Sequence, residues 1–319
     1  MKYRKLGKYG VKVSEVSLGS WLTYGGATEE ETARACIAKA YDLGINFFDT
    51  ANGYARGKAE EVVGAALKPY PREKLFVATK VFFPMGDGPN DHGLSRKHIM
   101  EQCHASLRRL GMDYIDLYQC HRYDTETPLE ETLMALDDLV RQGKILYYGV
   151  SQWSAGQIAH AVDLARGRGL HPPVSNQPIY NALERHLEKE VMPLCGREGI
   201  GLVVYSPLAQ GLLTGKYKPG QPLPEGSRAA DPNQNMFLNK GELDQKVLER
   251  VQKLAGIAEE LGITMSQLAL AWCLRRPEVS SVIIGASKPS QVEDNAGASG
   301  VTLSPDTLAA IDAALEIGA

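Results

Sequence analysis

The amino-acid sequence predicts a single domain, residues 1–319, folded as an α/β (β/α)8 TIM barrel, and three observations support this fold class. Eight short apolar runs lack the alternating polarity of half-exposed strands, which favours a parallel sheet covered by helices. Polar loops and segments with helix-capping signals separate these runs. The chain contains no low-complexity linker that would divide it into two domains.

Each expected barrel strand is a short apolar run between turn residues. In chain order these runs are 16–19, 45–48, 75–81, 114–120, 145–150, 174–177, 202–205 and 281–284. Outside this repeat, the ranges 2–6 and 11–14 flank a glycine-containing turn and predict an N-terminal β-hairpin.

Capping signals predict where the helices begin. Thr28 and Ser154 each stand three residues before a Glu or Gln, which is the spacing of a capping box. The stretch 127–130 combines a threonine cap, a proline at the first helical position and a glutamate at the third. The expected helices run from 28 to 44, 58 to 67, 96 to 111, 127 to about 143, from 154 onward, and 289 to about 298, with extra helices at 243–261, 266–275 and 305–315.

Composition limits the class of protein. Hydrophobic residues make up 44% and charged residues 23%, values of a soluble globular protein. The net charge of -3 gives no reason to expect nucleic acid as a partner, and we expect neither a signal peptide nor a membrane segment. The five scattered cysteines predict reduced thiols and a cytoplasmic location, and no metal-ligand spacing is found.

Polar residues follow the predicted strands at the end where active sites lie in such barrels. Asp49 follows the second strand, and burying a carboxylate there is costly without a cation or several donors. Lys80 lies in the apolar third strand, so an ion pair with Asp49 is expected. Tyr54 offers a phenol as proton donor, and Lys80 would lower its pKa by stabilising the tyrosinate.

His121 follows the fourth strand and completes a set of one carboxylate, one ammonium, one phenol and one imidazole. Taken singly, these residues also have structural interpretations: Asp49 can cap a loop and Tyr54 can be packing. Their occurrence together at corresponding strand ends favours catalysis. The segment 208–240 is too long for an ordinary βα loop, which also indicates a functional role.

With these residues in place, the chain resembles an aldo-keto reductase from about residue 3 to about residue 298. The resemblance rests on Phe48-Asp49-Thr50-Ala51-x-x-Tyr54, His121-Arg122-x-Asp124, Ser175-Asn176-Gln177, Tyr205-Ser206-Pro207-Leu208 and the stretch Gly211 to Lys216. Gly57-Lys58-Ala59-Glu60 and Gly285-Ala286-Ser287 resemble the branch of voltage-gated potassium channel β subunits and bacterial reductases. In this family the catalytic tetrad falls on Asp49, Tyr54, Lys80 and His121.

The resemblance implies NADP(H) as cofactor, bound without a Rossmann fold. No G-x-G-x-x-G follows a predicted strand, in agreement with this implication. The implied cofactor-binding residues are Trp21, Asp49, Ser151, Asn176, Gln177, Tyr205, Ser206, Pro207, Leu208, Gly211, Lys216, Arg228, Gly285, Ser287, Lys288, Gln291, Asp294 and Asn295. Gln291 stands where many members carry arginine, which predicts a smaller preference for NADPH over NADH. Tyr123 replaces a frequent proline, a change that we do not interpret.

Two functions remain open from the sequence. The first is a reductase that transfers hydride from NADPH to an aldehyde or ketone, with Tyr54 as general acid. The second is a nucleotide-sensing regulatory subunit of the channel type. The start of the barrel close to Met1 favours the enzyme weakly.

The substrate is expected to be a small carbonyl compound, and an aromatic pocket is expected around it. Its predicted wall consists of Trp21, Tyr24, Phe82, Phe83, Trp153 and Tyr180. A homo-oligomer is compatible with the sequence, which does not specify an oligomeric state.

Overall fold

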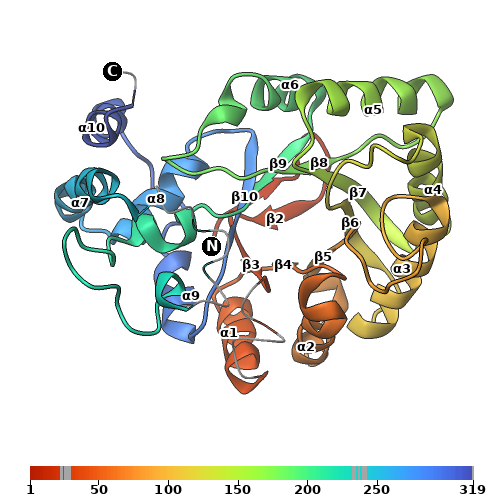
Figure 1. Cartoon of the computed structure of the whole chain (residues 1–319), viewed down its shortest axis with the longest axis horizontal. Coiled ribbons are helices and arrows are strands. Elements are labelled where there is room, and N and C mark those ends of the chain that lie inside the picture. Colours follow the sequence, from red (N-terminus) through yellow and green to blue (C-terminus); the bar gives the residue numbers. More distant parts are fainter. Residues whose placement is uncertain (22–23, 25–29, 232–234, 236–237, 239–242, 318–319) are drawn as a thin grey trace.

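Parallel strands form a closed barrel at the centre of the molecule (Figure 1). The computed structural model describes residues 1–21, 24, 30–231, 235, 238 and 243–317. The barrel strands are β3 (Val16–Gly19), β4 (Phe47–Asp49), β5 (Phe76–Val81), β6 (Ile115–Cys120), β7 (Ile145–Ser151), β8 (Ser175–Gln177), β9 (Gly201–Val204) and β10 (Val279–Ile284). They pair in the order β10-β3-β4-β5-β6-β7-β8-β9, so β10 closes the barrel against β3. The predicted (β/α)8 fold class is confirmed.

An N-terminal hairpin packs on one end of the barrel. Strands β1 (Tyr3–Lys5) and β2 (Lys12–Ser14) are antiparallel, as the sequence predicts. Leu6 and Val13 from this hairpin are fully buried and join one apolar cluster with Phe47 and Phe76 of the barrel strands. The hairpin therefore covers one end of the barrel, and the carboxyl ends of the strands remain available for a site.

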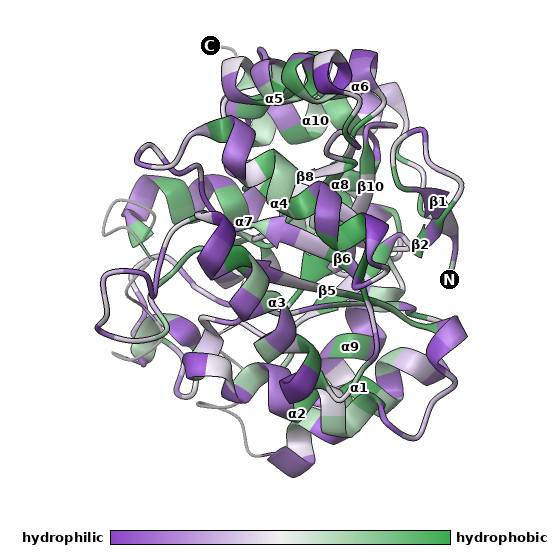
Figure 2. Cartoon of the chain, turned by 90° about the vertical axis from the view of Figure 1, so that its right-hand side faces the viewer, coloured by the Kyte–Doolittle hydropathy of each residue, from purple (hydrophilic) through white to green (hydrophobic). Residues whose placement is uncertain are grey.

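Helices surround the barrel on its outer side, with α1 and α2 below it, α3 and α4 to the right, and α5 and α6 above it in Figure 1. The helices are α1 (Glu30–Asp42), α2 (Lys58–Leu67), α3 (Arg96–Leu110), α4 (Leu129–Arg141), α5 (Ala155–Arg168), α6 (Val191–Glu198), α7 (Gln245–Glu260), α8 (Met265–Leu274), α9 (Pro289–Ala296) and α10 (Pro305–Leu315). Hydrophobic and hydrophilic residues alternate along them (Figure 2), as expected of helices that pack one face on a sheet. Ile37, Ile99 and Leu136 belong to the large apolar cluster between helices and barrel.

The capping prediction is confirmed for α5. The Ser154 hydroxyl accepts a hydrogen bond from the Gln157 backbone N–H, and the Gln157 side chain accepts one from the Ser154 N–H. Such a reciprocal pair satisfies two N–H groups that a helix leaves without partners. The other predicted capping box, at Thr28, lies outside the described residues.

The capping prediction for α4 is wrong. Thr127 does not cap this helix, which begins at Leu129 behind Pro128. The Thr127 hydroxyl instead donates to the Asp124 carboxylate, at 2.7 Å. Asp124 also accepts from the backbone N–H of Leu94, at 2.7 Å, and this competing acceptor explains the error.

Helix α6 is not among the helices predicted from the sequence. Pro193 is the third residue of the helix, and the first turn of a helix tolerates proline because its N–H groups lack intrahelical partners. The helix covers the barrel between β8 and β9 and supplies the buried side chains Met192, Leu194 and Cys195.

Within the described ranges, no helix has the length and apolar character needed to cross a bilayer. The same ranges hold no cluster of three or more His, Cys, Asp or Glu residues able to bind a metal ion. All five cysteines are buried and unpaired, in agreement with the prediction of reduced thiols.

Candidate active site

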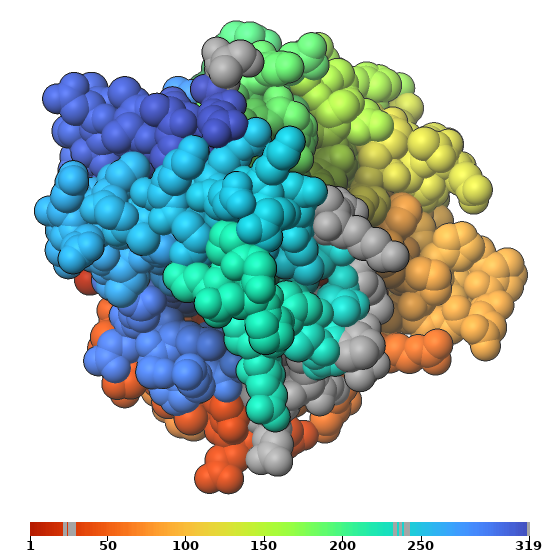
Figure 3. All heavy atoms as spheres, turned by 60° about the vertical axis from the view of Figure 1, so that its left-hand side comes forward, coloured from red at the N-terminus to blue at the C-terminus, as the bar shows by residue number. Residues whose placement is uncertain are grey.

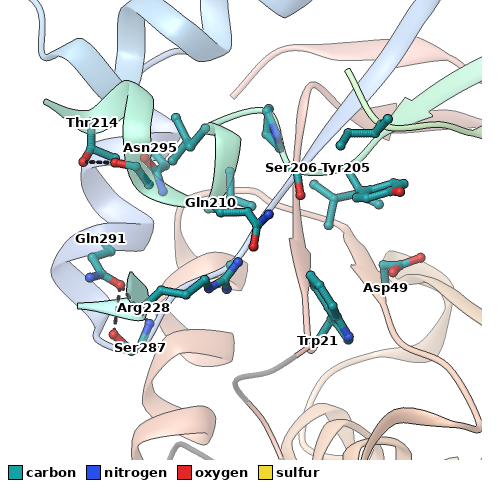
Figure 4. A pocket seen from close by; sticks show the side chains of 18 of the residues that line it. Trp21, Asp49, Tyr205, Ser206, Gln210, Thr214, Arg228, Ser287, Gln291 and Asn295 are labelled. Carbon is teal, nitrogen blue, oxygen red and sulfur yellow. Dashed lines mark hydrogen bonds between the residues drawn. The ribbon is translucent and has the colours of Figure 1, made fainter. Parts of the chain in front are cut away.

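A cavity of about 870 Å³ opens at the carboxyl ends of the barrel strands. Its lining includes residues at or just beyond these ends, namely Gly19, Asp49, His121, Ser151, Gln177, Tyr205 and Gly285. The segment 206–228 borders one side, and in Figure 3 this green-to-cyan segment lies beside the blue residues of the last part of the chain. Asp49 and Tyr205 lie at one end of the cavity and Ser287 and Gln291 at the other (Figure 4). The cavity is therefore long enough to separate two functional ends.

A buried chain of polar groups joins Asp49, Lys80 and Tyr54. The Lys80 ammonium donates to the Asp49 carboxylate at 2.5 Å, to the backbone carbonyl of Thr50 at 2.8 Å and to the Tyr54 hydroxyl at 3.2 Å. Lys80 is 0% exposed and Asp49 is 4% exposed. Asp49 and Tyr54 line the cavity, whereas Lys80 lies behind them. The ion pair expected from the sequence is confirmed.

The backbone around Tyr54 holds its side chain against Lys80. The backbone N–H of Thr50 donates to the backbone carbonyl of Ala78, and the N–H of Asn52 donates to the backbone carbonyl of Lys80. These bonds extend the pairing of β4 with β5 beyond the end of β4. Tyr54 then begins a 3-10 turn in which Ala55 has a φ of 47° and Arg56 a φ of 50°. Consecutive left-handed non-glycine residues are costly and persist where the surrounding structure imposes them, frequently at functional sites.

The charges of Lys80 and Asp49 have opposing effects on the pKa of Tyr54. Burial raises this pKa above its ordinary value, and the Lys80 ammonium lowers it without cancelling the effect of burial. Burial lowers the pKa of Lys80, but the neighbouring Asp49 and Tyr54 outweigh it and raise that pKa above the usual value. Tyr54 is therefore a protonated phenol beside a permanent cation. The predicted lowering by Lys80 is confirmed as a contribution, but burial outweighs it and the net shift of the Tyr54 pKa is upward.

His121 faces the same end of the cavity and is neutral. Its ring centroid lies 5.5 Å from that of Tyr54 and 4.8 Å from that of Phe83, both in edge-to-face geometry. Burial lowers its pKa well below the usual value, and the charges of Lys80 and Arg122 act in the same direction. A neutral imidazole beside the phenol can donate a hydrogen bond to a carbonyl oxygen without bringing another charge.

The neutral state of His121 predicts a pH dependence of stability. In the unfolded chain His121 takes up a proton near the ordinary pKa of about 6.5, whereas in the folded chain it does not. Its contribution to stability is thus complete above that pH and falls as the pH is lowered. Between mildly alkaline and mildly acidic pH, the melting temperature of the wild type should decline more steeply than that of His121→Asn. Parallel profiles would contradict the assignment of a neutral buried imidazole.

Gln177 and Asn176 are neighbours on β8 but point differently. Gln177 lines the cavity and donates from its amide to the Asp49 carboxylate at 2.9 Å, while the Ser151 hydroxyl donates to the Gln177 backbone carbonyl at 2.8 Å. Asn176 is fully buried and is not a lining residue. Because successive side chains of a strand point to opposite faces, residues 176 and 177 cannot both face the interior. The structure therefore does not bring Asn176 into the site.

Tyr205 lies at the same end of the cavity as Asp49 and is held by Gln152. The Gln152 amide donates to the Tyr205 hydroxyl at 2.7 Å. Gln152 has a φ of 58°, a left-handed backbone conformation that is uncommon for a residue with a side chain. Burial raises the pKa of Tyr205, so its ring presents a neutral phenol and an aromatic face to the cavity.

Two cations occupy the middle of the cavity. Burial lowers the pKa of Lys216, the charge of Arg228 lowers it further, and burial also lowers the pKa of Arg228. In the described part of the chain, neither cation forms an ion pair with a carboxylate. The Lys216 side chain lies over Gly211, where φ is 99° and an added Cβ would stand 2.8 Å from Lys216 Cε. Two neighbouring cations, an exposed Lys216 and a half-buried Arg228, beside bare backbone fit an anion such as a pyrophosphate.

The far end of the cavity lies at the N-terminus of α9. Gln291 accepts hydrogen bonds from the Ser287 backbone N–H at 2.8 Å and from its hydroxyl at 3.3 Å (Figure 4). Lys288 is exposed and immediately precedes Pro289, the first residue of the helix. An ammonium, a hydroxyl, an amide and the partial positive charge of a helix N-terminus suit a phosphate at this end.

Most of the predicted cofactor contacts line this one cavity. They are Trp21, Asp49, Ser151, Gln177, Tyr205, Ser206, Pro207, Leu208, Gly211, Lys216, Arg228, Gly285, Ser287, Lys288, Gln291, Asp294 and Asn295. Asn176 is the exception among them.

The predicted aromatic wall is correct in two positions only. Trp21 and Phe83 line the cavity. The residues that do not line it are Tyr24, Phe82, Trp153 and Tyr180. The Tyr180 hydroxyl instead accepts a hydrogen bond from Arg275, and its ring centroid lies 5.1 Å from that of Trp272. Position in the chain near a strand end does not determine whether a ring turns toward the cavity or into the helix layer.

Several lining residues had no predicted role. They include Arg122, Ile179, Glu184, Gln210 and Ser266. Gln210 precedes the stretch Gly211 to Lys216, and Arg122 follows His121, so adjacency to a predicted site residue is the signal that would have found them. Glu184 and Ser266 carry no such signal, because they follow β8 and begin α8 at points that only the fold brings to the cavity.

Comparison with known proteins agrees with this geometry. The sequence model described as "Aldo/keto reductase family" matches residues 15–316. A "Probable voltage-gated potassium channel subunit beta" of Arabidopsis thaliana is 46% identical over 298 residues, 92% of this chain and 90% of the relative. A protein of the same description from Oryza sativa subsp. japonica is 44% identical over 99% of this chain and 97% of its own length. A "Putative voltage-gated potassium channel subunit beta" of Schizosaccharomyces pombe is 45% identical over 97% of this chain and 92% of its own. The chain belongs to the aldo/keto reductase family.

Proposed function

We propose that the protein is an NADP(H)-dependent oxidoreductase that reduces aldehydes or ketones to alcohols. Membership of the aldo/keto reductase family implies oxidoreductase chemistry. The observation that carries the proposal is the chain of Asp49, Lys80 and Tyr54, which ends in a phenol on the cavity wall beside a neutral His121. This arrangement supplies a proton donor and a charge that stabilises its conjugate base.

In the proposed mechanism, Tyr54 donates its phenolic proton to the oxygen of the carbonyl as that oxygen gains negative charge. Lys80 stabilises the resulting tyrosinate, and Asp49 keeps Lys80 charged and fixed in place. His121, as a neutral donor, orients the carbonyl oxygen toward Tyr54. The chemistry that bound NADPH would supply is the hydride for the carbonyl carbon.

The donor set of the cavity suits NADP(H). Ser151 and Gln177 would hold the carboxamide, and Tyr205 would stack on the nicotinamide. Lys216, Arg228 and the backbone at Gly211 would bind the pyrophosphate. Ser287, Lys288 and Gln291 would surround the adenosine phosphate, with Asp294 and Asn295 nearby.

The charge at Lys288 predicts the cofactor preference. A 2′-phosphate carries close to two negative charges and is stabilised by charged donors. NADPH should therefore bind more tightly than NADH, and Lys288→Glu should erase or reverse that difference, a change of about 10-fold in relative affinity. Fluorescence titration with both cofactors measures it. Lys189→Glu, at an exposed lysine that does not line the cavity, is the control for net charge. Equal affinities of the wild type for the two cofactors would refute the proposal of NADP(H) preference.

The direct test of the proposed reaction is an assay with NADPH and 4-nitrobenzaldehyde. We expect consumption of NADPH that requires the aldehyde, together with formation of 4-nitrobenzyl alcohol. If NADPH binds but no alcohol forms with aldehydes, quinones or ketosugars, the proposed function is wrong.

A second candidate function is a nucleotide-sensing regulatory subunit. It is favoured by the relatives at 44–46% identity that are described as potassium channel β subunits. An intact tetrad does not separate the two functions. Tight binding of NADPH that stays unoxidised through long incubation with carbonyl compounds would favour the sensor.

We also propose that the protein is a single domain and that it is located in the cytoplasm. The buried free thiols support this location.

A further inference from the structure

Arg122 brings a second positive charge to the catalytic end of the cavity. It follows His121 at the end of β6 and lines the same cavity as Tyr54. One of its N–H groups donates to the His121 backbone carbonyl at 2.6 Å, and its guanidinium carbon stands 5.5 Å from the ring centroid of Phe83. These two contacts hold the guanidinium in place without neutralising it.

The Arg122 guanidinium retains donors for a ligand. A guanidinium has five N–H donors, and the hydrogen bond to His121 uses only one terminal nitrogen of Arg122. Among the residues that the structure describes, no carboxylate forms an ion pair with Arg122. The tetrad carboxylate, Asp49, is occupied by Lys80 and Gln177.

Glu184 is the other carboxylate near this part of the cavity, and it does not pair with Arg122. It accepts from a ring nitrogen of His186 at 2.7 Å and is about half exposed to solvent. Its negative charge is therefore screened by water, while the charge of Arg122 acts inside the cavity.

Arg122 lies close enough to the reacting groups to influence them. Its charge is among the causes that lower the pKa of Tyr54, of His121 and of Tyr205. The Phe83 ring contacts both neighbours of this end: its centroid is 4.8 Å from that of His121 and 5.5 Å from the Arg122 guanidinium carbon. A substrate whose carbonyl group lies beside Tyr54 and His121 can therefore extend toward the guanidinium within the same cavity.

We propose that the site selects carbonyl substrates that carry a carboxylate, and that the Arg122 guanidinium binds this carboxylate. The inference rests on the proposed reductase function and specifies its substrate class. The planar fork of a guanidinium matches a carboxylate, and the charge-assisted hydrogen bonds between them are stronger than those between neutral groups. A neutral aldehyde would leave the spare donors of Arg122 without a partner.

The test compares ortho-, meta- and para-formylbenzoate with their methyl esters, which have the same ring and carbonyl but no charge. With the wild type, at least one acid should have a kcat/KM about 10-fold or more above that of its ester, mainly through a lower KM. Arg122→Gln should abolish this ratio and Arg122→Lys should restore part of it. Arg166→Gln, which removes the same charge from the exposed surface of α5, should leave the ratio unchanged.

Equal losses on acid and ester in Arg122→Gln would overturn the inference, because they would mean that Arg122 acts on the catalytic groups and not on the substrate. A wild type that prefers the esters would overturn it as well. Binding of each acid and ester to the NADP⁺ complex, measured by calorimetry, separates this inference from the proposed function. Selective binding of the acid that depends on Arg122, without turnover of any aldehyde with NADPH, would sustain the inference about binding and refute the reductase.

Discussion

Replacement of Tyr54 by phenylalanine is expected to lower kcat for aldehyde reduction by about 100-fold or more, the scale of a lost general acid. The substitution removes the hydroxyl that stands 3.2 Å from the Lys80 ammonium and keeps the ring, which packs against His121. Cofactor affinity should change little, because the proposed cofactor contacts do not involve the phenol. The measurements are steady-state kinetics and a titration of NADPH.

Tyr70→Phe provides the matched control for this substitution. Tyr70 stacks on Tyr41 outside the cavity, so removal of its hydroxyl should leave kcat unchanged. A Tyr54→Phe enzyme with near wild-type kcat would remove Tyr54 from the mechanism, and the charges of Lys80 and Asp49 would then need another explanation.

Replacement of Lys80 by methionine is expected to damage both catalysis and stability. Without the ammonium, the tyrosinate that forms when Tyr54 gives up its proton has no neighbouring cation, so kcat should fall at least as far as in Tyr54→Phe. The Asp49 carboxylate would remain buried with only amide donors, chiefly Gln177. Removing one partner of a buried ion pair typically costs about 3–5 kcal/mol. Chemical denaturation measures this loss.

A double variant separates the two effects of Lys80. Adding Asp49→Asn to Lys80→Met removes the unpaired charge, so the free energy of unfolding should recover in large part. Activity should not recover, because Tyr54 still lacks its cation. A Lys80→Met protein as stable as the wild type would contradict the buried ion pair, and recovery of activity in the double variant would contradict the catalytic role.

The barrel could be predicted because its signals are local. The apolar run 202–204 predicts a strand covered on both sides, and its three residues are buried in β9. Glycines such as Gly111 and Gly169 end helices in a left-handed conformation. The error at Thr127 came from a partner distant in sequence, since Asp124 also bonds to Leu94 and draws the threonine away from the helix.

The sequence predicted which four polar side chains would be candidates for catalysis, and was less successful with the walls of the cavity. The tetrad follows from where strands end, because a barrel brings those ends together. The direction of a side chain around a strand end depends on register and packing, as Asn176 and Tyr180 show. The pKa of Tyr54 also required the structure, because the degree of burial decides the balance against Lys80.

The most direct test of the central claim follows the hydride. The enzyme is supplied with NADPH that carries deuterium at both hydrogen positions of the reactive ring carbon, and with 4-nitrobenzaldehyde in ordinary water. We predict an alcohol with deuterium on its carbinol carbon, formed at a rate that Tyr54→Phe lowers by about 100-fold. An alcohol without deuterium at that carbon, or no alcohol while NADPH remains bound, would contradict the proposed function.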